Sequence, residues 1–257
     1  DCLLSRGLGD VYKRQGVYSA MALLDLDTAK AKKYTDTKSV KEESGYTSPF
    51  CYPLWPCDRV GEYILAKSAV AGAMIQYMAS DNEDVPNQSP SNHLLGVGGQ
   101  CLEDGTEVYL DQDQANTVNG YGVTTAINQN GYRLWGNYTG AYPASSDAKD
   151  IWFAVRRMFS WQGNNFIQTY FDEVDDPMNN VLVQSVVDSE NIRCSAYAPK
   201  YWAGASIEYK SDDNPKTAIL AGTMKFRQHI APYTPAQEIV DIIDYDTDTL
   251  AAAVGGN

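Results

Sequence analysis

The sequence predicts an α/β fold of mixed sheets with packed helices. Three observations lead to this prediction: segments with apolar residues at helical spacing, short apolar runs typical of strands, and an Asn-Gly pair between two of those runs. Hydrophobic residues make up 44% of the 257 residues, which suffices for a sizeable core. The longest apolar runs, such as residues 68–79, fall short of the roughly 20 residues that a bilayer span requires. We therefore expect no membrane insertion.

The first half of the chain predicts one long helix and one hairpin. Residues 61–82 place their apolar side chains at helical spacing, and residues 111–119 suggest a helical turn. Two strands are expected within residues 123–136, joined by a turn at Asn130 and Gly131. Asn-Gly favours such a turn because both residues tolerate the positive φ angles that it requires.

The second half predicts further helices and strands in alternation. Residues 150–155 read as a buried strand, and residues 156–174 as a helix. Pro177 suits the first position of a second helix, which continues through 179–192. Strands are expected at 205–210, 217–230 and 237–246, before a flexible tail at 248–257.

Residues 1–15 do not continue smoothly into the sequence that follows. They resemble the translated library-adapter sequence found at the ends of reading frames assembled from metagenomic reads, and we interpret them as a non-native artefact. On this interpretation the native protein begins upstream, and the chain is a fragment.

The net charge of −13 is unevenly distributed. Residues 1–47 contain 8 basic and 7 acidic residues, which leaves 12 basic and 26 acidic residues in 48–257. So acidic a surface repels phosphate backbones, which argues against direct nucleic-acid binding. It favours a basic partner surface, or self-association that depends on salt.

The sequence predicts no enzyme, no cofactor and no metal site. It contains neither a phosphate-binding loop nor a strand-linked GxGxxG motif, and its two histidines lie far from any nucleophile signature. Residues 111–120 begin like an EF-hand loop but have Ala115 where a ligand should stand. The five cysteines show no CxxC spacing; Cys51 and Cys57 could pair, although a reduced pair is favoured.

Three alternating carboxylates lie at and just beyond the end of the last expected strand: Asp244, Asp246 and Asp248. On a strand they would share one face, where they could bind a hard cation. The favoured alternative is a charged strand edge, because charge on an edge blocks promiscuous pairing.

An unusual cluster of rings lies in residues 130–143, with Trp135 and Gly136 at its centre. Two interpretations compete: a flat aromatic platform for a sugar, or a turn-and-strand unit whose rings pack inside the fold or against a copy of itself. A second notable feature is the adjacent pair Arg156 and Arg157. In so acidic a protein we expect both guanidinium groups to contact carboxylates within or between subunits, the alternative being ordinary helix-surface arginines.

Read together, several segments resemble the tail sheath proteins of contractile bacteriophages and related injection machines. The resemblance covers roughly residues 50–245. Its motifs are PNQSPSN (86–92), DGTEVYL (104–110), NGYRLWGN (130–137), the run from 141 to 161, FIQTYFDEVDDP (166–177), VVDSENIR (186–193) and the run from 214 to 240. One departure is Tyr138, which stands where such sheaths often have arginine.

The resemblance implies a partial middle domain of subtilisin-like topology at 16–145 and a carboxyl-terminal sheath domain at 146–247. It implies a structural subunit that polymerises around an inner tail tube and contracts to drive it through a cell envelope. The implied partners are other sheath subunits, the tube, and baseplate and tail terminator proteins, in a virion tail assembled in the bacterial cytoplasm. Residues implied in assembly or structure are Trp135, Gly136, Arg156, Arg157, Asn214, Pro215, Ile239 and Ile242.

On this resemblance the four rings Tyr132, Trp135, Tyr138 and Tyr142 are structural. The alternative hypothesis is a carbohydrate-binding or carbohydrate-active protein of a gut bacterium, suggested by the 18 Tyr and 5 Trp of the chain. The last strand would add to the sheet of a neighbouring subunit.

Overall fold

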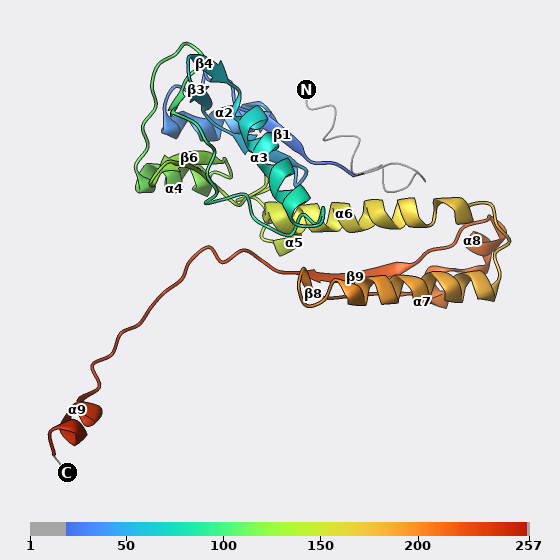
Figure 1. The fold of residues 1–257 in the computed structure, drawn as a ribbon. Coiled ribbons are helices and arrows are strands. Elements are labelled where there is room, and N and C mark those ends of the chain that lie inside the picture. Colours follow the sequence, from blue (N-terminus) through green and yellow to red (C-terminus); the bar gives the residue numbers. More distant parts are fainter. Residues whose placement is uncertain (1–18, 256–257) are drawn as a thin grey trace.

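The computed structural model describes residues 19–255, so the proposed artefact at 1–15 lies outside the described residues. The fold is of the mixed α/β type that the sequence predicts (Figure 1). Its elements are, in order, β1 (Ala22–Asp25), η1 (Tyr34–Asp36), α2 (Thr37–Glu43), β2 (Cys51–Leu54), β3 (Cys57–Val60), β4 (Tyr63–Leu65), α3 (Lys67–Asp81), β5 (Gly99–Cys101), α4 (Gln112–Gly120), β6 (Thr125–Asn128), β7 (Tyr132–Trp135), α5 (Ala148–Ile151), α6 (Phe153–Thr169), η2 (Phe171–Glu173), α7 (Asn180–Ala196), β8 (Trp202–Glu208), η3 (Ser211–Asp213), α8 (Lys216–Leu220), β9 (Arg227–Pro232) and α9 (Thr247–Ala253).

The centre of the first half is the parallel pair β1–β2, which a bridge between Leu54 and Thr124 extends toward β6. All four residues of β2 are buried, as expected for a strand that is covered on both faces. Helix α3 packs on β1, and its first turn is fixed by Asp25, whose Oδ1 accepts the N–H of Ser68 at 2.9 Å. A carboxylate is favourable there because helix amino-terminal N–H groups lack intrahelical partners.

A second sheet has the order β4-β3-β5, and β6 and β7 form the predicted hairpin. At the hairpin turn Asn130 has φ 53° and Gly131 has φ 109°, the positive values that the Asn-Gly pair predicted. Helix α4 confirms the helical turn near 111–119, and Asp111 caps it by accepting the N–H of Gln114 at 2.8 Å.

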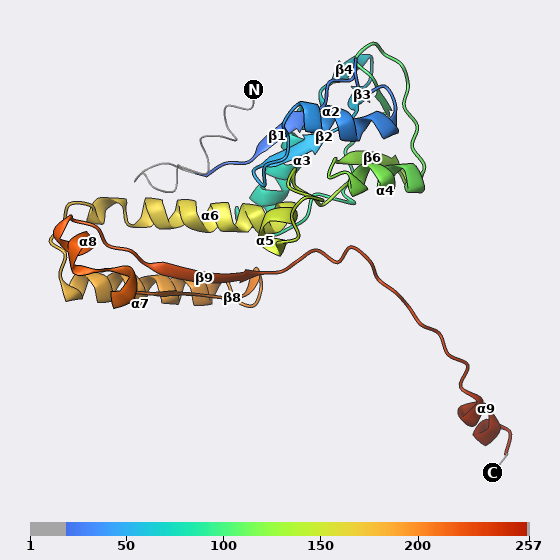
Figure 2. The same ribbon diagram turned by 180° about the vertical axis from the view of Figure 1, so that it is seen from behind.

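The second half consists of the long helices α6 and α7 and the antiparallel hairpin β8–β9, which lies against both of them (Figures 1 and 2). Met158 of α6, Cys194 of α7 and Trp202 of β8 are at most 1% exposed and form one apolar cluster. At its other end, α6 contributes Phe153 to a separate cluster with Tyr52 of β2. Helix α6 therefore belongs to the cores of both halves.

Three predicted elements of the second half need correction. The expected strand at 150–155 is helical on both sides of Trp152, with the end of α5 before it and the start of α6 after it. The expected strand at 217–230 divides into helix α8, a turn, and strand β9. Pro177 is not the first residue of α7, because Asn179 caps that helix by accepting the N–H of Leu182 at 2.9 Å.

In the first half, residues 61–82 are helical only from Lys67 onward, and Tyr63–Leu65 form strand β4 instead. Among the described residues, no helix is both long and apolar enough to cross a bilayer.

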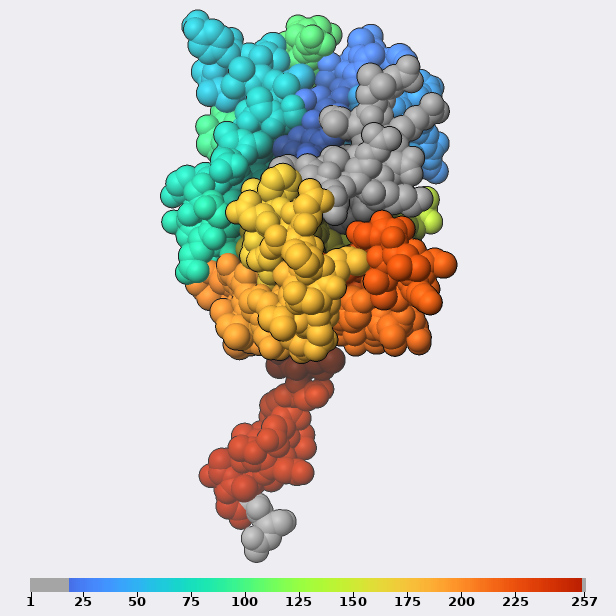
Figure 3. All heavy atoms as spheres, turned by 90° about the vertical axis from the view of Figure 1, so that its right-hand side faces the viewer, coloured from blue at the N-terminus to red at the C-terminus, as the bar shows by residue number. Residues whose placement is uncertain are grey.

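After β9 the chain stays in contact with the packed body as far as Gln237, which accepts a hydrogen bond from Tyr138, and then leaves it. In the space-filling view the last part of the chain, drawn in red, extends away from the rest of the molecule (Figure 3). The strand predicted at 237–246 is wrong for the described chain, where this segment has no strand partner. The three aspartates therefore do not share a strand face; Asp246 caps α9, a helix within the tail that the sequence predicted to be flexible.

Candidate functional site

The candidate site is the region where the β6–β7 hairpin, the start of α6 and the root of the carboxyl-terminal tail meet. Trp135 ends β7 and donates its Nε1–H to Asn116 Oδ1 of α4 at 2.9 Å. Gly136 follows with φ 154°, and a Cβ there would lie 2.9 Å from Thr124 Cβ. Both residues therefore hold the hairpin against its neighbours, as expected for structural residues.

A stack of three rings follows the hairpin. Tyr138 lies 3.8 Å from Tyr142 between ring centroids, at an interplanar angle of 5°, and 4.9 Å from Trp152 at 25°. Backbone bonds flank the stack, because Phe153 donates its N–H to the Asn137 carbonyl at 2.9 Å. Since these rings pack on one another, they form no free platform for a sugar, and the carbohydrate hypothesis has no support.

The ring stack also contacts the tail. The hydroxyl of Tyr138 donates to Gln237 Oε1 at 2.6 Å, across 99 residues of sequence. Slightly earlier in the tail, the Tyr233 hydroxyl donates to the Pro199 carbonyl at 2.9 Å. Neither contact is evident from the sequence, which places Gln237 only at the beginning of an expected strand. We define residues 233–237, fixed by these two hydrogen bonds, as the tail root.

Replacing Tyr138 with Phe removes one hydroxyl and keeps the ring stack. We expect a loss of about 1 kcal/mol or less in the free energy of unfolding, because a single partly exposed hydrogen bond contributes roughly that much. Hydrogen exchange and limited proteolysis should nevertheless become faster around Gln237. Tyr142→Phe is the matched control, because it changes the adjoining ring of the same stack and leaves the Gln237 contact in place. Equal protection of the tail root in Tyr138→Phe and the unchanged chain would contradict its role.

The two adjacent arginines have different environments. Arg156 is 8% exposed, its Nη1 lies 3.2 Å from Asp150 Oδ1, and its guanidinium packs 4.0 Å from the Phe50 ring centroid. This confirms a carboxylate contact within the chain. Arg157 makes no ion pair with any residue in 19–255; it lies 5.5 Å over the Phe153 ring, and burial lowers the pKa of its guanidinium to about 10. A carboxylate partner for Arg157 in another subunit stays a prediction.

Asn214 is a buried organiser of the loop between β8 and β9. Its Nδ2 donates to the carbonyls of Lys210 and Lys225, each at 2.9 Å, and its Oδ1 accepts the N–H of Lys225 at 2.7 Å. Pro215 stands directly before α8, where its missing N–H costs nothing. This Asn-Pro pair has a structural role inside the chain; a role in assembly stays a prediction.

The tail beyond its root has an apolar surface. Between residues 239 and 245, five large apolar side chains are between 69% and 89% exposed: Ile239, Val240, Ile242, Ile243 and Tyr245. So many exposed apolar side chains in succession are unusual on a soluble surface and indicate an interaction segment.

Two buried polar clusters stiffen the body behind this region. Lys67 and Asp58 form an ion pair in which both side chains are 0% exposed, and burial raises the pKa of the Asp58 carboxyl, opposed by Lys67. In the other half, the fully buried Glu190 of α7 accepts the Nε2–H of Gln162 from α6 at 2.6 Å, and the same amide donates to Gln228 of β9 at 3.0 Å. This second cluster ties two helices and a strand together.

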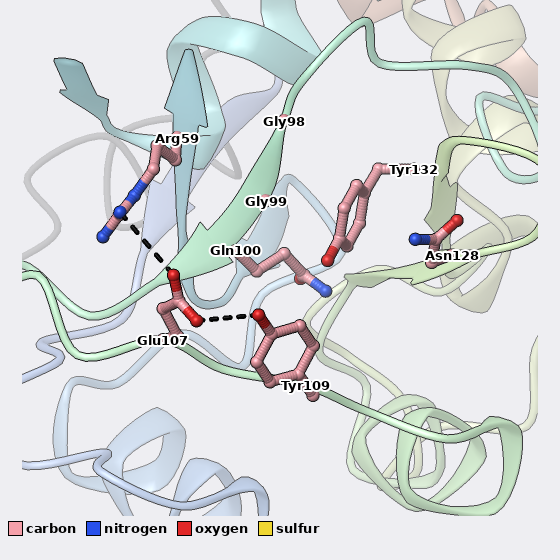
Figure 4. Close-up of a pocket in the computed structure, with 8 residues that line it drawn as sticks. All are labelled: Arg59, Gly98, Gly99, Gln100, Glu107, Tyr109, Asn128 and Tyr132. Carbon is pink, nitrogen blue, oxygen red and sulfur yellow. Dashed lines mark hydrogen bonds and ion pairs between the residues drawn. The ribbon is translucent and has the colours of Figure 1, made fainter. Parts of the chain in front are cut away.

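A polar hollow of about 230 Å³ lies between β3, β5 and the hairpin (Figure 4). Glu107 in its wall accepts from the Tyr109 hydroxyl at 2.7 Å and lies 3.7 Å from Arg59. The amide of Gln100 is equally engaged, with its Nε2 donating to the Ala126 carbonyl at 2.7 Å. These groups already have partners, and no group of His, Cys, Asp or Glu in the described chain could hold a metal ion. The hollow therefore offers no evident ligand site.

Comparisons with known proteins point in one direction. No family profile matches the chain. The chain is 27% identical over 197 residues to the major tail sheath protein of Serratia phage KSP20, and 22% identical over 215 residues to the tail sheath protein of Escherichia phage P2. It is also 28% identical over 180 residues to the tail sheath protein of Burkholderia phage BcepMu. These matches cover 73%, 79% and 66% of this chain, respectively.

The chain is thus similar to the contractile tail sheath proteins of phages. Solved structures agree on the fold: the sheath complex of an extracellular contractile injection system, PVC, in its contracted state superposes with a TM-score of 0.75 at 18% identity, covering 92% of this chain and 67% of the other. The contracted helical sheath of the anti-feeding prophage superposes with a TM-score of 0.63 at 20% identity, covering 78% and 57%. The sheath resemblance and the α/β fold class are thus confirmed.

The chain spans about half the length of the first two curated relatives, 48% for KSP20 and 52% for P2, and 36% of the BcepMu protein. The subtilisin-like topology of residues 16–145 and the domain boundary at 145/146 stay predictions.

Proposed function

We propose that this chain is part of a structural subunit that polymerises into the contractile sheath of a phage tail or phage-like injection system, and that it has no catalytic activity. The observation that carries the proposal is the contrast between a body stiffened by buried polar clusters and an apolar tail that has no strand partner among residues 19–255. Subunits that shift against one another in an assembly need a stiff body and separate connectors. The names of the relatives support the same function.

In this proposal the tail beyond Gln237 connects one copy to the next. An extended segment with exposed backbone groups can add to the edge of a neighbour's sheet and bury its apolar side chains there. The sheath would surround an inner tube and meet a baseplate and a tail terminator at its ends. A similar structure, the anti-feeding prophage baseplate, supports the baseplate contact. Assembly would take place in the host cytoplasm, and the product would be part of a virion tail.

The proposal is tested with the protein encoded by the complete reading frame, by negative-stain electron microscopy and sedimentation at low and high salt. We expect hollow striated tubes of uniform width, with a polymer fraction that depends on salt because the chain is strongly acidic. A monodisperse particle at every salt concentration would contradict the proposal.

A paired variant tests the tail. Ile239→Ser with Ile242→Ser should raise the concentration needed for polymerisation roughly 100-fold or more, since two isoleucines that a neighbouring subunit would bury contribute about 3 kcal/mol or more. The matched control is Leu250→Ser with Val254→Ser, which changes exposed apolar residues in and just after α9 of the same tail. Equal polymerisation of the first variant and the control would contradict a connecting role for residues 239–242.

A further inference from the structure

We propose that Cys57 and Cys101 form an intrachain disulfide site that closes when the chain meets a low-molecular-weight disulfide. The two cysteines are directly opposite each other in the antiparallel pair β3–β5, where the register joins Cys57 to Cys101. The sequence suggested Cys51 as a possible partner of Cys57, but Cys51 lies in a different sheet, opposite Ala22 of β1. None of the four described cysteines is in a disulfide in this structure.

The backbone hydrogen bonds fix the geometry of this pair. On the edge of β5 that faces away from β3, Cys101 lies opposite Glu107 in an antiparallel β-bridge. The hydrogen bonds of this bridge are made by the neighbours of Cys101: the Leu102 N–H donates to the Thr106 carbonyl, and the Val108 N–H donates to the Gln100 carbonyl. The N–H and C=O of Cys101 itself therefore point toward β3, which makes Cys57 and Cys101 a hydrogen-bonded pair. The Cα atoms of such a pair lie about 5.5 Å apart, within the range of roughly 4.4–6.8 Å that disulfides occupy.

The two side chains also lie on the same face of the sheet, because directly opposite residues of antiparallel strands share a face. Their mutual influence shows in the thiol of Cys57: burial, with smaller contributions from the nearby Asp25 and Cys101, raises its pKa to about 11. A high pKa leaves little thiolate at neutral pH. The pair is therefore expected to close slowly and to close faster as the pH rises.

Exposure sets the order of the steps. Cys57 is partly exposed, whereas Cys101 is 0% exposed, so the small disulfide meets Cys57 first. The Cys57 thiolate attacks one sulfur of the small disulfide, forms a mixed disulfide and releases one small thiol. Cys101 then loses its proton and attacks the Cys57 sulfur, which releases the second small thiol. Two protein thiols are oxidised, and one small disulfide is reduced to two thiols.

The test uses the 257-residue chain with Cys2 replaced by Ser, oxidised glutathione at pH 8.5 as the probe, and acid quenching before mass spectrometry. We expect the chain to lose two hydrogen atoms, and a reductant to restore them. Chymotryptic cleavage after Leu54 separates Cys51 from Cys57, whereas the bonds after Tyr52 and Trp55 precede proline and resist the enzyme. The linked peptides should therefore identify Cys57 and Cys101. The product should form faster at pH 8.5 than at pH 7.

Cys57→Ser should abolish the loss of hydrogen, and Cys51→Ala should leave it unchanged. Cys101→Ala should stop the reaction at the glutathione adduct of Cys57. A lasting glutathione adduct on Cys57 in the chain that retains Cys101 would overturn the proposal, as would a Cys51 link or full retention of both thiols. If Cys101→Ala does not fold, the peptide map of the chain that retains both cysteines still decides the outcome.

Discussion

Gly122→Ala is expected to lower the free energy of unfolding by roughly 3 kcal/mol or more. Gly122 has φ +71°, which costs an alanine about 1–2 kcal/mol. Its added Cβ would also overlap the Tyr142 carbonyl oxygen and lie 2.7 Å from Lys41 Nζ. Neither can move easily, because that ammonium donates to the Tyr142 carbonyl at 2.6 Å and to the Tyr121 carbonyl at 2.8 Å.

The chain supplies a matched control for this substitution. Gly45 has φ +69°, and a Cβ added there would have nothing within 4 Å, so Gly45→Ala should cost only the backbone strain of about 1–2 kcal/mol. Urea denaturation of both variants measures the difference, which isolates the overlap at Gly122. Equal losses in the two variants would show that the contact with Tyr142 relaxes without cost.

Breaking the buried ion pair is the second substitution with a large expected effect. Asp58→Asn leaves the fully buried Lys67 ammonium without a charged partner, and Lys67→Met leaves a buried carboxylate. Each single change should cost about 3–5 kcal/mol in the free energy of unfolding. The double variant should lose clearly less than the sum, because it leaves no isolated charge in the interior.

Denaturation of the two single variants and the double variant completes a thermodynamic cycle. The exposed pair between Lys200 and Glu83, with side chains 61% and 68% exposed, provides the control cycle, in which each change should alter the free energy of unfolding little because solvent screens the pair. Simple additivity at Lys67 and Asp58 would mean that the two charges do not depend on each other.

The sequence could predict the fold class and the hairpin because both depend on local patterns. Asn130 and Gly131 occupy the positive φ angles that their residue types favour. The strand predicted at 150–155 is wrong for a physical reason: Phe153, Ala154 and Val155 are all buried at the start of α6. A helix end that is covered on every side shows no helical period, so its apolar run cannot be told from a buried strand.

The candidate site was predicted in part. The sequence shows the aromatic cluster around Trp135 and Gly136, and it predicts the carboxylate contact of Arg156. The contact between Tyr138 and Gln237 was not, because 99 residues separate them and neither residue type signals the other. The isoleucine-rich run at 237–246 has the composition of a strand, but a strand also needs a partner, and local sequence does not supply one.

The shared helix α6 has a mechanical consequence. Phe153 and Met158 lie five residues apart on one rigid rod, yet they are anchored in different cores. A load that enters through the tail root next to Tyr138 would reach this rod within a few residues and would be borne by both cores at once. Relative motion of the two halves would have to pull one end of α6 out of its core. A deforming force should therefore bend the tail before it distorts the body.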